Sequence, residues 1–318
     1  AAFDCLTRQD VLDYHASRYV PNNVVLSIAG DVDAAEILSH LELLVEDLKS
    51  RPLNREPIPH EPHQFGSRRV RKEFAVPYSK LHLAWRLPCS AHPDTPALSA
   101  LSSILGGGRS ARFYEKFHDR LGLVYSIEVH SNQSETDEGA FTISMDVDRA
   151  QRDKVRDLVL QELRNLAEED FTEDLKRVCK QTRVSRLRRR SSASGVASEM
   201  GADWFGSRNL NLSSEWQEAI ERVTTEDLHR VCSTWLSAPN VTEVSLDPPG
   251  SNAGDEERAS ASAGTALSEH VLGNGMKVVI REDHRLPLAY ACMAFKAGCR
   301  AENEHDAGVT DLMSECLL

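Results

Sequence analysis

The sequence lacks a surplus of basic residues, a closely spaced pair of cysteines and a long apolar run. Its formal net charge is −12. A protein that binds nucleic acid through the phosphates needs an excess of Lys and Arg, so we expect no nucleic-acid partner. The 7 cysteines are scattered and include no Cys-x-x-Cys pair, which argues against a zinc ribbon or a disulfide framework. No run approaches the roughly 18 apolar residues that cross a bilayer, so we expect no membrane span.

The chain does contain a long internal repeat. Thr7 and Thr224 each begin a helix-like stretch with an Asp three positions later, and each stretch leads to a Pro-Asn pair and a β-rich run. The two threonines are 217 positions apart, and a fixed long period of this kind indicates tandem domains of similar structure. We therefore expect the chain to be an interior part of a larger tandem protein.

The copy in the middle of the chain has the periodicities of a complete domain. Alternating apolar residues predict strands, namely 81–87, 124–129, 141–147 and the run after Pro239. Helical spacing predicts helices, namely 94–105, 110–119 and three or four more within 149–236. Strands with one polar face are typical of antiparallel sheets. The expected fold class is α+β, with a mostly antiparallel sheet and helices packed on one face, repeated as tandem homologous domains.

Partial copies are expected on both sides of this domain. Before it, Thr7 caps a predicted helix over 7–19, and a strand over 23–29 precedes a second helix that Asp31 or Asp33 caps. After it, two strands are predicted within 268–283 around the turn Gly273-Asn274-Gly275. The expected elements beyond these are a third strand over 288–296 and a helix near His305.

One basic run stands out from the acidic balance. Residues 183–190 contain Arg183, Arg186, Arg188, Arg189 and Arg190 at the end of a long helical pattern. Cations at this position complement the negative end of a helix dipole. The run is therefore interpreted as a solvated helix end, with a patch that binds an anionic ligand as the open alternative.

Several stretches together resemble the pitrilysin/insulinase-type zinc peptidases. The run from Leu272 to His284, then Phe295 to Glu302 and Ala307-Gly308, is similar to the opening of a peptidase domain of that family. The run from Tyr19 to Asp33 resembles the end of the family's first domain. The stretches 106–114 and 122–126 resemble its second domain. The matches follow the family's order over nearly the whole chain.

This resemblance implies a domain organisation. Residues 1–50 correspond to the C-terminal part of a first peptidase-like domain and 51–66 to a linker. Residues 67–247 form a complete second, substrate-facing domain and 248–267 a flexible linker. Residues 268–318 are the N-terminal part of a third, degenerate peptidase-like domain. The parent would have two halves around a chamber, so the implied partners are a peptide substrate and the other half of the same polypeptide.

The metal-binding motif of the family is absent. Active members carry His-x-x-Glu-His on a helix, because two imidazoles four positions apart share a zinc and the Glu activates its water. At the matching place this chain has Asp311, Ser314 and Glu315. The resemblance therefore implies zinc in the parent, bound upstream, and no zinc ligand or catalytic residue in this chain.

The second domain carries the candidate substrate-binding residues. In active relatives an Arg and, seven positions later, a Tyr lie against the substrate and stabilise charge on the scissile carbonyl. Tyr125 matches the Tyr, but His118 stands in place of the Arg, and Arg112 and Arg120 are out of phase. The structural alternative is that Tyr125 is an ordinary strand residue and His118 a surface helix residue.

The implied function is the central part of a zinc-dependent metalloendopeptidase that cleaves peptides or unfolded chains inside a two-halved chamber. The alternative within the family is a non-catalytic scaffold or partner subunit. A chance resemblance would leave an unrelated α+β binding module.

Overall fold

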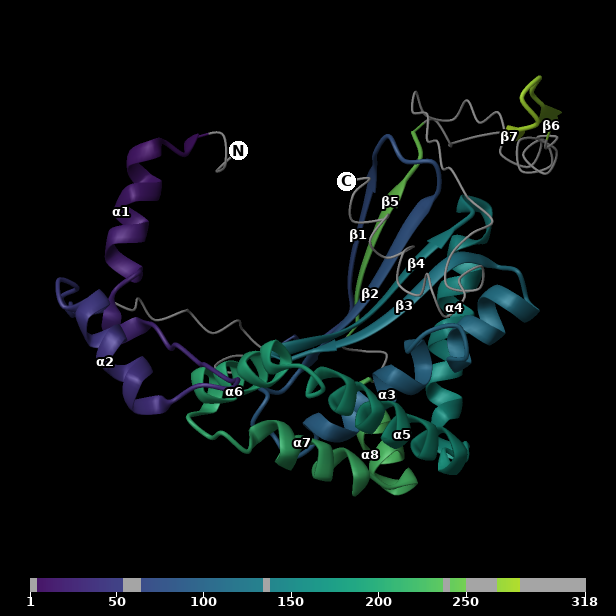
Figure 1. Cartoon of the computed structure of the whole chain (residues 1–318). Coiled ribbons are helices and arrows are strands. Elements are labelled where there is room, and N and C mark those ends of the chain that lie inside the picture. The colour runs from purple at the N-terminus through teal and green to yellow at the C-terminus, as the bar shows by residue number, and fades with distance from the viewer. Residues whose placement is uncertain (1–4, 54–63, 134–137, 237–240, 250–267, 281–318) are drawn as a thin grey trace. The chain divides into compact units, whose positions relative to one another are not determined.

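The computed structural model describes residues 5–53, 64–133, 138–236, 241–249 and 268–280. The chain divides into two compact units, Ala1–Ala263 and Gly264–Leu318. Most of the first unit is a layer of helices packed on a five-stranded sheet (Figure 1). Within the described residues, no helix has the length and apolar composition to cross a membrane.

The sheet is mixed but mostly antiparallel, as the alternating patterns predict. Its strands are β1 (Arg68–Glu73), β2 (Ser79–Leu87), β3 (Val124–Asn132), β4 (Gly139–Val147) and β5 (Thr242–Asp247), in the order β1-β5-β2-β4-β3. β1 runs parallel to β5, and the β5–β2, β2–β4 and β4–β3 pairings are antiparallel. The expected α+β fold class is confirmed.

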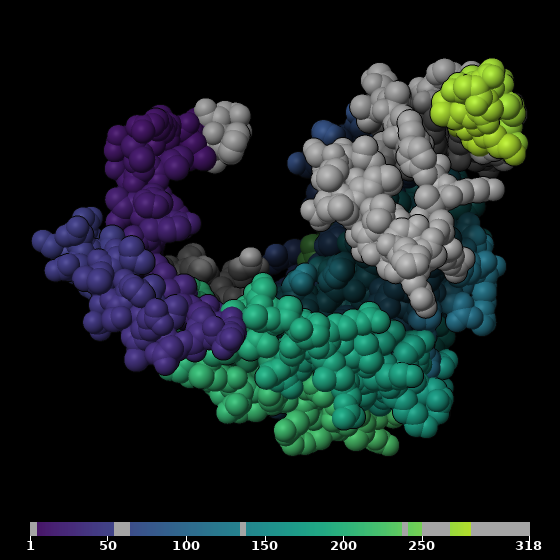
Figure 2. Space-filling view, viewed as in Figure 1, coloured from purple at the N-terminus to yellow at the C-terminus, as the bar shows by residue number. Residues whose placement is uncertain are grey.

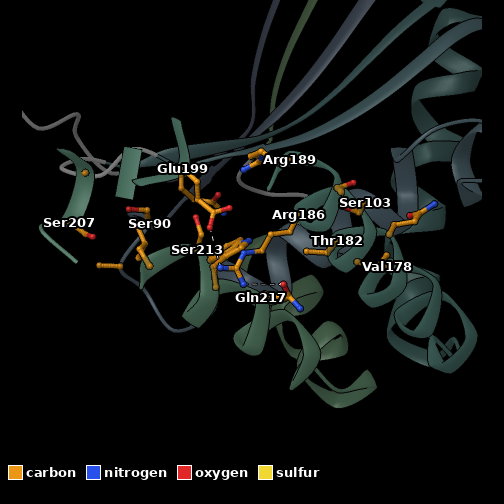
Figure 3. A pocket seen from close by; sticks show the side chains of 17 residues that line it. Ser90, Ser103, Val178, Thr182, Arg186, Arg189, Glu199, Ser207, Ser213 and Gln217 are labelled. Carbon is orange, nitrogen blue, oxygen red and sulfur yellow. Dashed lines mark hydrogen bonds and ion pairs between the residues drawn. The ribbon is translucent and has the colours of Figure 1, made fainter. Parts of the chain in front are cut away.

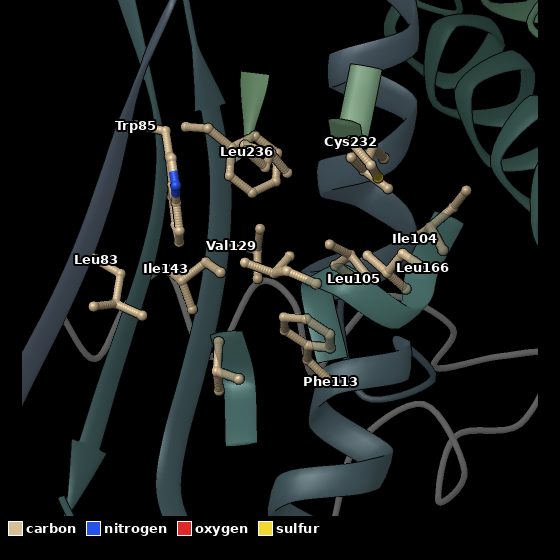
Figure 4. Packing of buried hydrophobic residues seen from close by; sticks show 14 of the residues in the cluster. Leu83, Trp85, Ile104, Leu105, Phe113, Val129, Ile143, Leu166, Cys232 and Leu236 are labelled. Carbon is tan, nitrogen blue, oxygen red and sulfur yellow. The ribbon is translucent and has the colours of Figure 1, made fainter. Parts of the chain in front are cut away.

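Alternation along the strands builds the core on one face of the sheet. Leu83 and Trp85 on β2 and Ile143 on β4 are at most 1% exposed, while His82 on β2 faces the other way and is only partly buried. Figure 4 shows these strand side chains pointing toward apolar side chains of the helices. Burial of each large apolar side chain contributes about 1.5–3 kcal/mol.

The helices that cover this face come mainly from the second half of the domain. They are α3 (Thr95–Gly106), α4 (Arg152–Asn165), α5 (Thr172–Arg189), α6 (Ala193–Ser207), α7 (Leu212–Glu221) and α8 (Thr225–Trp235), with the short 3-10 turns η4 (Arg149–Gln151) and η5 (Leu166–Glu168). Figure 2 shows α5 to α7, coloured teal to green, as a continuous packed surface. Five α-helices lie within 149–236, so the expected three or four was too few. Ser192 caps the start of α6, and Arg208, in the left-handed region of backbone conformation, ends it. These two residues separate α6 from the helices on either side.

One edge of the sheet was not expected from the sequence. β1 reads Arg-Arg-Val-Arg-Lys-Glu, and all six residues are exposed, so no apolar alternation marks it. Its neighbour β5 turns Glu243 and Asp247 toward the helices, and both are buried. Arg69 on β1 donates to Glu243 at 2.8 Å, and Arg152 on α4 is ion-paired with Asp247. Charge pairing therefore joins β1, β5 and α4 where apolar contacts are few.

Residues 5–53 form helices but no strand. α1 (Arg8–Arg18) starts at a Thr7 cap, η2 (Pro21–Asn23) is a 3-10 turn, and Asp33 caps α2 (Ala34–Val45). The strand expected over 23–29 is wrong for this structure: residues 24–29 carry no strand assignment, and Val24 and Leu26 are about 60% exposed. Ser27 Oγ donates to the carbonyl of Ala197 on α6 at 2.6 Å.

The second unit contains a hairpin. β6 (Ser268–Val271) and β7 (Lys277–Ile280) pair antiparallel. Gly275 in the turn between them has φ of 86°, a conformation that favours glycine. The two predicted strands are confirmed, while the predicted strand over 288–296 and the helix near His305 lie outside the described residues.

Candidate functional site around Tyr125

Tyr125 lies at a β-bulge at the start of β3. In the pairing of β3 with β4, Val124 faces Val147 and Ser126 faces Asp146, so Tyr125 is the extra residue on its strand. A bulge bends the strand and redirects a side chain, and bulges are over-represented next to active sites. The Tyr125 side chain is 46% exposed although both neighbours along the strand are more buried.

Three strand ends meet at this bulge. Val147 at the end of β4 faces both Ser79 at the start of β2 and Val124 at the start of β3. Tyr78 and Asp148, the residues just outside those ends, are therefore brought beside Tyr125. The rings of Tyr78 and Tyr125 lie 4.0 Å apart, centroid to centroid, and Tyr125 Oη donates a hydrogen bond to Asp148 Oδ1 at 2.9 Å.

A buried polar group supports the same end of the sheet. Ser79 Oγ donates to Asp247 Oδ1 at 2.7 Å, and Asp247 is ion-paired with Arg152; all three side chains are buried. Burial by itself lowers the pKa of Arg152, but its hydrogen bonds to Asp153 and Asp247 outweigh this and raise it. Removal of one partner of such a buried pair is strongly destabilising, so the pair anchors the start of β2, next to Tyr78, to β5 and α4.

His118 lies on a wider helical turn just before this strand. Residues Tyr114–Arg120 form the π-helix η3, where the amide of Leu121 donates to the carbonyl of Lys116. Gly122 then turns the chain at φ of 58°. π-helical turns are rare and occur frequently at functional sites. A helix was expected over 110–119, and its π geometry carries no sequence signal that we recognised.

The two candidate residues have different polar partners. His118 Nδ1 lies 2.7 Å from Asp119 Oδ1, and the imidazole stacks on Tyr114 at 4.4 Å between centroids. Tyr125 is held by Asp148 instead. The nearby arginines are also engaged: Arg112 bonds Asp174 at 2.7 Å, and Arg120 bonds Glu115 at 2.5 Å. Neither arginine is free to take the place that His118 occupies in the sequence pattern.

Sequence reasoning missed Tyr78 and Asp148. Both stand immediately outside an alternating run: Tyr78 precedes β2, and Asp148 follows β4. Polar residues next to strand ends can be recognised in a sequence. Only the pairing register shows that the start of β2 and the end of β4 lie beside the start of β3.

The chemistry available to Tyr125 is limited by its single proton. A phenol hydroxyl donates one hydrogen bond and accepts others. While it donates to Asp148 it cannot also donate to a substrate carbonyl, so stabilising developing negative charge requires the hydroxyl to exchange Asp148 for the substrate oxygen. The observed geometry is that of a half-exposed tyrosine whose hydroxyl donates to Asp148.

No metal centre is found among the residues that the structure describes. No group of three or more His, Cys, Asp or Glu side chains in these ranges is arranged to hold a metal ion. The degenerate motif positions Asp311, Ser314 and Glu315 lie outside the described residues.

Sequence comparison identifies relatives among zinc proteases. The chain is 24% identical over 250 residues to a Helicobacter pylori protein named zinc protease PqqE, covering 76% of this chain and 55% of that protein. It is 26% identical over 245 residues to mitochondrial-processing peptidase subunit alpha-2 of Dictyostelium discoideum, covering 73% and 53%. The chain therefore spans a little over half the length of these relatives.

Structural comparison gives the same fold. A protease from Helicobacter pylori superposes with a TM-score of 0.68 at 24% identity, covering 77% of this chain and 60% of that one. A peptidase M16 inactive domain from Pseudomonas fluorescens superposes with a TM-score of 0.67 at 20% identity, covering 79% and 60%. Residues 6–181 match the family described as the peptidase M16 inactive domain. The resemblance to zinc peptidases is thus confirmed, and the chain belongs to the M16 peptidase family.

Proposed function

We propose that this chain is a non-catalytic, substrate-facing part of a zinc metalloendopeptidase that cleaves peptides or unfolded chains. In this proposal the zinc is bound by a segment upstream of the chain, and two halves of one polypeptide enclose the substrate in a chamber. The segments meet near residues 50, 66, 247 and 267. The third peptidase-like segment, with Asp311, Ser314 and Glu315 at the motif positions, is inactive.

The position of Tyr125 carries the proposal. It is half-exposed at a bulge, and a buried ion-paired group links β2, β5 and α4 at the same end of the sheet. Preorganised donors aimed at developing charge are a large source of catalytic rate. The match to the inactive domain and the zinc-protease names of the relatives support a role beside a metal site that other residues provide.

The test uses the full-length parent protein and a peptide substrate. Tyr125→Phe removes only the hydroxyl, and we expect kcat/KM to fall by about 10²–10³, the loss seen when one such donor is removed. Asp148→Ala removes the competing acceptor, so activity should stay within a few-fold of the unaltered protein. Tyr14→Phe removes an exposed hydroxyl on α1, away from Tyr125 and His118, and serves as the control.

The structural alternative gives a different pattern. If Tyr125 only stabilises the strand end, Tyr125→Phe and Asp148→Ala lower the unfolding temperature by similar amounts and leave kcat/KM unchanged. That outcome would remove Tyr125 from the substrate-binding surface.

A partner subunit without catalysis is the second candidate. It is favoured by His118 at the position of the family's Arg and by the engagement of Arg112 and Arg120 in other ion pairs. Zinc analysis of the purified full-length protein separates the two functions. One zinc per polypeptide supports the enzyme, and zinc-free protein that retains its fold supports the partner subunit.

A further inference from the structure

A cavity lies within the helical layer, apart from the Tyr125 site. Its volume is about 900 Å³, and its wall combines residues of α5, α6 and α7 with the loop before α3 (Figure 3). This volume falls within the range of small-molecule sites in proteins. All of the residues used below belong to the second domain.

The wall carries three charged side chains, and two of them come from the basic run of the sequence. Arg186 and Arg189 lie on α5, and Glu199 lies on α6. The basic run was interpreted as a solvated helix end, with an anion-binding patch as the alternative. The structure turns these two arginines toward the cavity, which favours the alternative for this part of the run.

Arg186 and Glu199 form a fixed pair inside the wall. Arg186 Nη2 lies 3.1 Å from Glu199 Oε1 and 2.6 Å from Ser214 Oγ, and Arg190 Nη1 also bonds Glu199 Oε1 at 2.9 Å. The Glu199 side chain is only 4% exposed, and burial raises its pKa, but the hydrogen bonds and charges of Arg186 and Arg190 outweigh burial and lower it. Glu199 is therefore a carboxylate at neutral pH.

This buried pair is not fully satisfied. Arg186 Nε and Glu199 Oε2 are both buried, and neither has a hydrogen-bond partner among the residues that the structure describes. Nearly all buried polar groups in folded proteins are paired, so such groups call for a specific explanation. Their presence marks the cavity wall as polar, with one donor, Arg186 Nε, that a ligand acceptor can reach only from the cavity.

Arg189 supplies the uncompensated charge. Its side chain is exposed at the cavity and forms no ion pair or hydrogen bond within the described part of the chain. Glu199 is shared by Arg186 and Arg190, so Arg189 is the one guanidinium of the wall that has no carboxylate partner among the described residues. The rest of the wall supplies hydroxyl groups and an apolar surface that includes Val178, Leu212 and Trp216.

We propose that this cavity binds a small organic monoanion, a carboxylate with an apolar body. The carboxylate pairs with Arg189, and the body lies against Trp216 and Leu212. A single unpaired guanidinium matches one negative charge, whereas a dianion would leave a second charge beside Glu199. This inference does not depend on the proposed peptidase function, because it uses neither Tyr125 nor a metal.

The test titrates the intact 318-residue chain with three probes of similar size. These are 4-phenylbutyrate, 4-phenylbutanol and 4-phenylbutylamine, which share a phenylalkyl body and carry an anionic, a neutral and a cationic head group. Calorimetry should show saturable binding of the carboxylate, binding of the alcohol weaker by about ten-fold or more, and no binding of the amine, because charge-assisted bonds are the stronger ones. Quenching of tryptophan fluorescence on binding should disappear in Trp216→Phe while calorimetric binding remains.

Matched variants locate the anion. Arg189→Gln should weaken 4-phenylbutyrate by about ten-fold or more, while Arg183→Gln, an exposed arginine of the same run outside the cavity, should leave the affinity unchanged. Both side chains are exposed, so neither change should alter the unfolding temperature. Equal affinities of the two variants, equal binding of the amine and the carboxylate, or no saturable binding of any probe would each overturn the proposal.

Discussion

The helices α1 and α8 begin in the same way and end in different surroundings. Thr7 accepts from the amide of Asp10 while Asp10 accepts from the amide of Thr7, and Thr224 and Asp227 repeat this reciprocal capping box. α8 buries Leu228, Val231 and Cys232, whereas α1 buries no residue. The run after α8 is the strand β5, and the corresponding run after α1 is not a strand.

This difference separates local from tertiary control. A capping box uses only groups within four residues of each other, so both copies form it. A strand needs neighbours to pair with, and β5 has β1 and β2 on its two sides. The apolar residues that follow α1 have no comparable pairing in the described residues and stay exposed. Sequence repetition thus predicts both helix starts, whereas a strand forms only at the copy that has neighbouring strands to pair with.

The largest expected contrast is between Leu228→Ala and Val11→Ala, which occupy equivalent positions of the repeat. Leu228 is fully buried, so truncation should lower the free energy of unfolding by about 2–5 kcal/mol. Val11 is 61% exposed, and exposed positions usually change stability by no more than about 0.5 kcal/mol. Urea unfolding of the two variants measures both. An equal loss of unfolding free energy in the two variants would show that α1 packs as tightly as α8.

The caps give a smaller contrast. Thr224→Ala should lower the free energy of the main unfolding transition by about 1 kcal/mol, the usual effect of losing an N-cap. Thr7→Ala should increase amide exchange within α1 and leave the main unfolding transition unchanged, because α1 buries nothing. Hydrogen exchange and thermal unfolding of the two variants check this. A lower temperature of the main unfolding transition in Thr7→Ala would contradict the difference drawn between α1 and α8.

The smallest expected difference between the two caps is in their response to acid. For Asp10 the hydrogen bonds from Thr7 lower the carboxyl pKa; for Asp227 burial raises it, but the bonds from Thr224 and Arg230 prevail and lower it. A depressed carboxyl pKa contributes stability above the unfolded value of about 3.9 and loses it as pH falls through the folded value. Acidification below about pH 4 should therefore weaken both caps, but only Asp227→Asn should flatten the pH dependence of the main unfolding transition. NMR titration of both carboxylates checks the direction.

The sequence predicted much of the fold and only part of the candidate site. Alternation of apolar and polar residues predicted β2, β3, β4 and β5, because one face of each strand is buried. It missed β1, whose residues are charged and held by ion pairs, and it predicted a strand over 23–29 that has no pairing here. Tyr125 was found through resemblance, but its bulge and its contacts with Tyr78 and Asp148 depend on register between strands, which no single segment encodes. The cavity beside the basic run depends in the same way on three helices meeting.

The parallel pairing of β1 with β5 has a consequence for synthesis of the protein. The Arg69–Glu243 pair that joins these strands links residues 174 positions apart. At the usual pace of about 5–20 residues per second, β1 leaves the ribosome roughly 10–35 seconds before its partner exists. During that interval its density of positive charge keeps an unpaired strand soluble, since charged edges resist pairing with other chains. The charged composition of β1, which gives it no apolar alternation, thus also protects the nascent chain from pairing with other chains.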